Sequence, residues 1–155
     1  MTSDAHDPTD TATLLKGAAI SGLANAVING AIQAFLLAGK GPVAISTGAI
    51  GTAEHPVLGG AVMLATSLAM IMTAIGHLTL KVPKRPFLPD GLWLVVKHGM
   101  FAFGAVVTLA VLWQRFAGTV LVSVPTAVMV LALIAGVVAA VVQAITIVAS
   151  VAPRR

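Results

Sequence analysis

Hydrophobic residues along the chain gather into four long runs, separated by short stretches that are polar or rich in glycine and proline. A helix that crosses a bilayer needs about 20 mostly apolar residues, and each run reaches that length. The pattern therefore predicts four membrane-spanning helices, over residues 14–38, 57–80, 91–114 and 126–150. We expect an all-α integral membrane protein folded as a four-transmembrane-helix bundle over residues 14–150, with a disordered tail before it (1–13) and a basic tail after it (151–155).

Composition supports a chain that lies almost entirely in the bilayer. Hydrophobic residues make up 58% of the sequence, charged residues only 9%, and the mean hydropathy is +1.02, whereas soluble domains carry about 25% charged residues. The chain contains no cysteine, which excludes disulfides and thiolate metal sites. The net charge of +4 comes from basic residues in loops and tails, so we expect the lipid bilayer and no nucleic acid as a partner.

The basic residues also predict an orientation. Leaving out Lys97, which falls inside a predicted span, six of them fall on the side of the two tails and of the loop at 81–90, and two fall on the other side. Since cytoplasmic loops of membrane proteins carry the excess of lysine and arginine, we expect both termini in the cytoplasm. The predicted location is the cell (inner) membrane, crossed several times.

Polar residues recur within the first apolar run. Ser21, Asn25, Asn29 and Gln33 follow one another every four residues and form one ridge of a helix. An unpaired amide in hydrocarbon is costly, so these side chains should face protein or water. One interpretation is a solute path, to which Thr73 of the second run would contribute. The alternative is hydrogen bonding between helices.

A second ridge lies beside the first and consists of very small residues: Ala18, Gly22, Ala26, Gly30 and Ala34. Small residues at this spacing allow two membrane helices to approach closely, with a right-handed crossing. The fourth run, rich in valine, alanine and leucine, is interpreted as a wall that faces lipid or another subunit.

A set of polar and ionisable residues is expected in the inner leaflet. His77, Lys97, His98 and Gln143 fall at similar predicted depths. Ionisable groups inside a membrane are often functional, and this polar layer could attract anions, relay protons or bind haem. The simpler alternatives are hydrogen-bonded histidines and a lysine that extends to the headgroups.

None of the five acidic residues falls within a predicted span, although Asp90 could cap the third one. Cation transporters usually place a carboxylate near the membrane centre, which disfavours that class. No catalytic motif is present, so we expect no enzyme activity, and we expect no metal and no cofactor. The first hypothesis is a channel or permease-type subunit for a small solute or anion. The alternatives are a structural or accessory subunit without transport activity, and a redox protein with a haem bound by two histidines.

The two longer connections leave alternatives open. Residues 39–55 could lie on the outer surface or re-enter the membrane as a lid. Residues 81–90, with prolines three residues apart at 83, 86 and 89, favour a stiff polyproline II tether or a docking site for a cytoplasmic or membrane partner. Because four helices enclose little space, a conducting form would require a homodimer or a larger homo-oligomer.

Overall fold

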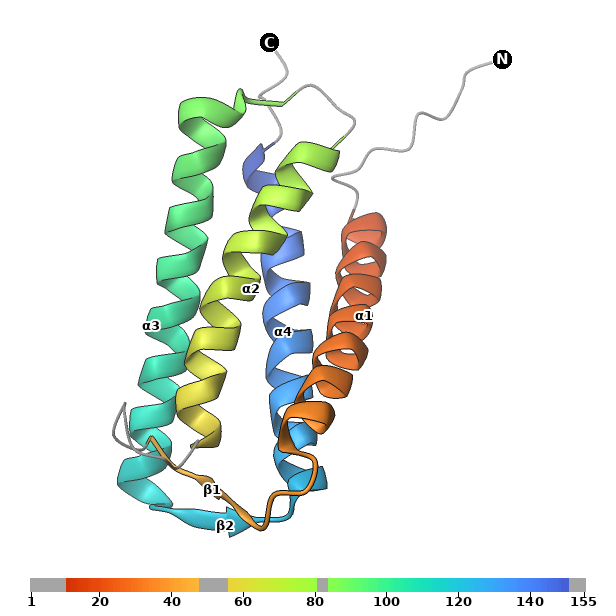
Figure 1. Cartoon of the computed structure of the whole chain (residues 1–155). Coiled ribbons are helices and arrows are strands. Elements are labelled where there is room, and N and C mark those ends of the chain that lie inside the picture. The colour runs from red at the N-terminus through yellow and green to blue at the C-terminus, as the bar shows by residue number, and fades with distance from the viewer. Residues whose placement is uncertain (1–10, 48–55, 81–83, 151–155) are drawn as a thin grey trace.

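Four long helices make up most of the protein (Figure 1). The structure, a computed structural model, describes residues 11–47, 56–80 and 84–150. All four helices are long and apolar enough to cross a membrane, which confirms the number of spans predicted from the sequence. The bounds of the helices are α1 Thr11–Leu37, α2 Val57–Thr79, α3 Leu92–Phe116 and α4 Val124–Ser150.

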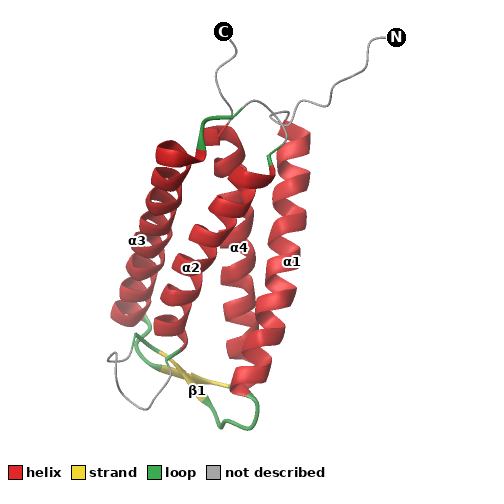
Figure 2. Ribbon diagram, turned by 45° about the horizontal axis from the view of Figure 1, so that its top comes forward, coloured by secondary structure: helices red, strands yellow, loops and turns green. Residues whose placement is uncertain are grey.

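The helices pack in an order that differs from their order in the chain. α1 packs on α4, α4 on α2, and α2 on α3, whereas α3 and α4 touch at few places. α1 and α3 therefore lie at opposite edges of the structure (Figures 1 and 2). The bundle expected from the sequence is open between α3 and α4.

Small residues form the contact between α1 and α4. A Cβ atom added at Gly22 would lie 2.8 Å from the carbonyl oxygen of Gly136 and 3.0 Å from Cβ of Ala140. A Cβ atom at Gly30 would lie 3.2 Å from Cβ of Ala132. The small-residue ridge of α1 thus meets an equivalent ridge on α4, in which the residues also recur every four positions.

α4 consequently has helical neighbours on two sides, whereas Met129, Leu133 and Val148 on its remaining face are exposed. The wall facing lipid or another subunit that the sequence predicted would be that face alone. α4 packs against both α1 and α2. Ala127, Ala135 and Ala139 on α4 are fully buried. Because lipid tails and a protein interior are equally apolar, the high hydrophobicity of α4 does not distinguish the two surroundings.

Two short strands cross one end of the structure, which we call the strand end. β1 (Val43–Ile45) pairs antiparallel with β2 (Val120–Val122), as Figure 2 shows beneath the helices. Val43 and Ile45 are buried in one apolar cluster with residues of the helices. This part of the 39–55 connection therefore packs on the helix ends, and residues 48–55 lie outside the described part of the chain.

The other end, where α1 begins and α4 ends, we call the terminal end. The ammonium group of Lys84 donates hydrogen bonds of 2.8 Å to the carbonyl oxygens of His77 and Leu78, which would otherwise be unpaired at the end of α2. The backbone N–H of Arg85 donates to the carbonyl oxygen of Ser150 (3.2 Å). The loop is therefore fastened to the ends of both α2 and α4.

The backbone of this loop is extended only in part. Pro86 has the φ and ψ of polyproline II (−59°, 148°), and the kinked segment η1 (Phe87–Gly91), in which Leu88 is extended (φ −110°, ψ 124°), then leads into α3. Gly91, and not Asp90, precedes the first residue of α3, and no side chain caps that helix. The Asp90 cap suggested by the sequence is therefore not formed. The polyproline II tether remains a prediction, since residues 81–83 lie outside the described part of the chain.

Candidate functional site

A cluster of buried polar side chains lies in the half of the structure nearer the terminal end. Three helices contribute to it, and each of its side chains is at most 6% exposed. Buried polar groups are costly unless they are hydrogen-bonded, and every member has a partner of that kind. The members of this polar cluster are Thr73, His77, His98, Thr146 and Ser150.

His98 joins α3 to both α2 and α4. Its Nδ1 atom lies 3.0 Å from Oγ1 of Thr73 and 3.3 Å from Oγ1 of Thr146. The hydroxyl of Thr73 donates its single proton to the carbonyl oxygen of Ala69 (2.7 Å), so towards His98 it can only accept. We therefore assign the proton of the ring to Nδ1, which leaves Nε2 as the free ring atom.

His77 joins α2 to α4 and to the loop at the terminal end. Its Nε2 atom lies 3.1 Å from the carbonyl oxygen of Arg85, which can only accept, so Nε2 carries a proton. Its Nδ1 atom lies 2.9 Å from Oγ of Ser150. The ring also packs against Phe87, with 5.7 Å between the ring centroids. Both nitrogens of His77 are thus engaged by the protein.

A polar cavity of about 310 Å³ opens beside His77 at the terminal end. Arg85 and Lys97 contribute two cations to its lining, and Asp90 contributes one carboxylate. Within the part of the chain that the structure describes, neither the guanidinium of Arg85 nor the ammonium of Lys97 forms an ion pair. We call this space the cationic cavity, since its lining has a formal surplus of one positive charge.

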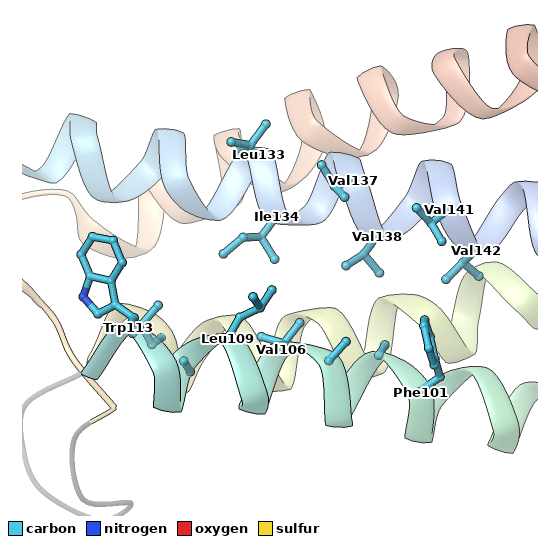
Figure 3. A pocket seen from close by; sticks show the side chains of 14 residues that line it. Phe101, Val106, Leu109, Trp113, Leu133, Ile134, Val137, Val138, Val141 and Val142 are labelled. Atoms are coloured by element: carbon cyan, nitrogen blue, oxygen red, sulfur yellow. The ribbon is translucent and has the colours of Figure 1, made fainter. Parts of the chain in front are cut away.

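A longer apolar groove of about 510 Å³ runs between α3 and α4 (Figure 3). Apart from the indole N–H of Trp113, its lining carries no polar side chain. Phe101 and Leu109 of α3 line one wall, and Val138 and Val141 of α4 line the other, as the figure shows. Such a groove offers surface to hydrocarbon but none to a polar solute.

The amide ridge lies outside both spaces. Asn25 donates to the carbonyl oxygen of Ser21 and Asn29 to that of Asn25, both at 3.0 Å and within α1. The amide of Asn25 also contacts Sδ of Met72 on α2 (3.7 Å). Gln33 is half-buried. The hydroxyl of Ser21 is buried without a hydrogen-bond partner among the described residues.

Replacing Asn29 with leucine should change the free energy of unfolding by less than about 1 kcal/mol, because its amide bonds only to its own helix. Thermal unfolding of the purified protein in detergent measures the effect. Asn25→Leu, which also removes the contact with Met72, is the matched comparison. A loss of more than about 2 kcal/mol for Asn29→Leu would mean that this amide also bonds outside α1.

The residues of the polar layer expected from the sequence lie in three places. His77 and Lys97 both line the cationic cavity. His98 is hydrogen-bonded to Thr73, which the sequence had suggested for the solute path. Gln143 lies beside Gly76, where an added Cβ atom would be 3.5 Å from its Oε1.

Sequence reasoning missed several residues of the site. Thr146 and Ser150 on α4 are the partners of the two histidines, and their i, i+4 spacing on one helix was a readable signal. Arg85 and Trp93 also line the cavity. Arg85 had been counted only as a loop charge, and its backbone is held by hydrogen bonds to Ser150 and His77 that the sequence did not predict.

Comparisons of the chain with protein-family models, with curated proteins and with solved structures found no match. The fold and the site thus define the chain as a membrane protein with four candidate spans, and the inference of function rests on its own residues.

Proposed function

We propose that the protein is a channel or permease-type subunit that takes up small anionic solutes at the cationic cavity. The observation that carries the proposal is the pair of cations, Arg85 and Lys97, that line one cavity without an ion pair among the described residues. Ionisable groups within membrane-spanning segments usually pair or serve a ligand. A bound anion would supply the missing partner.

Several features support an anion at this site. Trp93 and His77 also line the cavity, and the attraction between opposite charges is stronger beside such apolar rings than in bulk water. Lys97 lies on α3 about one and a half helical turns after Leu92, so an anion drawn to it would already have entered the membrane. In this proposal the protein lies in the cell (inner) membrane with its terminal end facing the cytoplasm, in line with the distribution of basic residues.

The proposed path requires more than one copy of the chain. Beyond His98 the space between α3 and α4 is apolar, and α1, which carries the amide ridge, lies at an edge of the structure. Ser21, Asn25, Asn29 and Gln33 would line a path where α1 meets a second subunit. The proposal therefore includes a homodimer or a larger homo-oligomer, and no chemical transformation of the solute.

Anion uptake into liposomes that contain the purified protein tests the proposal. The double variant Arg85→Gln/Lys97→Gln should lower the uptake at least tenfold, because the cavity loses both cations. Lys16→Gln/Arg115→Gln, which removes two exposed basic side chains away from the cavity, should retain the uptake of the wild type. Wild-type uptake no faster than that of empty liposomes, or equal uptake by the two double variants, would refute the proposal.

A structural or accessory subunit without transport activity is the second candidate. The hydrogen bonds of Asn25 and Asn29 to their own helix favour it, since amides held in this way stabilise α1 without lining a path. In that case Asn25→Leu would change stability or oligomeric state, and no anion uptake would exist to be changed. A partner at the 81–90 loop belongs to this second candidate. No observation favours haem, since both ring nitrogens of His77 already have protein partners.

A further inference from the structure

The cationic cavity and the apolar groove lie one after the other between α3 and α4. On α3, Lys97 lines the cavity and Phe101, four residues later on the same face, lines the groove. On α4, Ser150 lines the cavity and Val142, eight residues earlier, lines the groove. A ligand that extends from one space into the other would therefore be charged at one end and apolar along the rest.

The length of the groove suits a hydrocarbon chain. Along α3 the lining runs from Phe101 to Trp113, a separation of twelve residues, which is about 18 Å at 1.5 Å per residue. A single leaflet contributes about half of the roughly 30 Å of hydrocarbon in a bilayer. One acyl chain that entered from the terminal end would run along most of the groove.

The charge of the cavity suits a phosphodiester. Arg85 and Lys97 supply two positive charges and Asp90 one negative charge, so one singly charged anion would neutralise the lining. Arginine binds phosphate oxygens through two parallel hydrogen bonds. Basic pockets between membrane helices on the cytoplasmic side are typical binding sites for anionic lipid headgroups.

We propose that one anionic phospholipid of the surrounding leaflet binds between α3 and α4, with its phosphate in the cationic cavity and one acyl chain in the apolar groove. This inference rests on the proposed function, because both place an anion in the cationic cavity. Here that anion is the phosphate group of a phospholipid. The lipid would explain why a cavity with unpaired cations and a groove with almost no polar lining follow one another between the same two helices.

A second copy of the chain fits the two spaces less well. An apolar helix could cover the groove, but none of the five acidic residues lies in α1, α2, α3 or α4. A helix of another copy could not bring a carboxylate to Arg85 and Lys97 at the end of the groove. A phospholipid carries both the apolar chain and the anion in one molecule.

The two tryptophans of the chain provide the measurement, since Trp93 lines the cavity and Trp113 lines the groove. The full-length protein is placed in phosphatidylcholine vesicles, and phospholipid with bromine atoms on its acyl chains is added to quench the indole fluorescence. Trp93→Phe leaves Trp113 as the only reporter. Brominated phosphatidylglycerol should reach half-maximal quenching of Trp113 at a mole fraction at least tenfold lower than brominated phosphatidylcholine.

Two pairs of variants assign that preference to the cavity and the groove. Arg85→Gln/Lys97→Gln should remove the tenfold preference, and Lys16→Gln/Arg115→Gln should keep it. Ala105→Phe fills the groove and should reduce the quenching of Trp113, whereas Val111→Phe, on an exposed part of α3 outside the groove, should not. Helix content measured by circular dichroism identifies any variant that fails to fold, and native mass spectrometry counts the lipids bound to those that do.

The outcomes separate this inference from the proposed function. Equal quenching by the two lipids, or a preference that survives loss of both cations, would overturn the lipid site. If inorganic phosphate abolished the quenching of Trp113 by brominated phosphatidylglycerol, the lipid site would also be overturned, because the cavity would then bind a free anion. Quenching is measured independently of anion flux. If the protein takes up anions but shows no preference for phosphatidylglycerol, only the lipid inference is refuted. If the protein binds the lipid but transports no anion, only the proposed function is refuted.

Discussion

Gly22→Leu should separate α1 from α4 and lower the free energy of unfolding by about 3 kcal/mol, near the upper end of the usual effect of overpacking. The reason is that an added Cβ atom at Gly22 would lie 2.8 Å from the carbonyl oxygen of Gly136. That oxygen belongs to the backbone of α4 and cannot rotate away as a flexible side chain could. Thermal unfolding of the purified protein in detergent gives the magnitude.

Gly17→Leu is the matched control for this substitution. Gly17 lies on the same helix, and an added Cβ atom there would meet nothing within 4 Å, so its leucine variant should unfold close to the wild type. The absence of native cysteine allows a second measurement. A disulfide between Gly30→Cys and Ala132→Cys should form in the wild-type background and fail to form when Gly22→Leu is added. Equal stability of the two leucine variants would contradict the close contact of α1 and α4.

His77→Ala should lower the free energy of unfolding by a similar amount, about 3 kcal/mol. The ring is 1% exposed, so its loss leaves a cavity. It also removes two hydrogen bonds, to Ser150 and to the backbone of Arg85, each worth about 1 kcal/mol. Denaturant unfolding followed by circular dichroism measures the change.

Ser150→Ala separates the two parts of that effect. It removes only the hydrogen bond to Nδ1 of His77 and should cost about 1 kcal/mol. The exchange of backbone amides adds a local measurement, because the N–H of Arg85 is bonded to the carbonyl of Ser150 and should exchange faster in His77→Ala. If His77→Ala cost no more than Ser150→Ala, the histidine would not join the loop to the helices as described.

The sequence could predict the four helices because the length of an apolar run is decided by the thickness of the bilayer. The spacing of Gly22, Ala26 and Gly30 also predicted a close helix contact. The partner was missed, although Ala132, Gly136 and Ala140 repeat at the same spacing. Lipid and protein interior are equally apolar, so hydrophobicity does not show which face of α4 is buried.

The candidate site was predictable in part for a related reason. His77, His98 and Lys97 stood out because polar groups within a span are rare. Thr146 and Ser150 did not stand out, since hydroxyl side chains often bond to their own helix. The strands β1 and β2 have three residues each, too few for an alternating pattern, and their pairing joins segments more than seventy residues apart.

The pairing of α1 with α4 has a consequence for the synthesis of the protein. α1 leaves the ribosome first, and the helix that it packs against leaves last, after α2 and α3. Until α4 has been synthesised, α1 lies in the bilayer without the helix that it packs against in the folded protein. Asn25 and Asn29 donate to carbonyl oxygens of their own helix. Their side-chain amides can therefore be hydrogen-bonded in the newly inserted α1 before α4 is present.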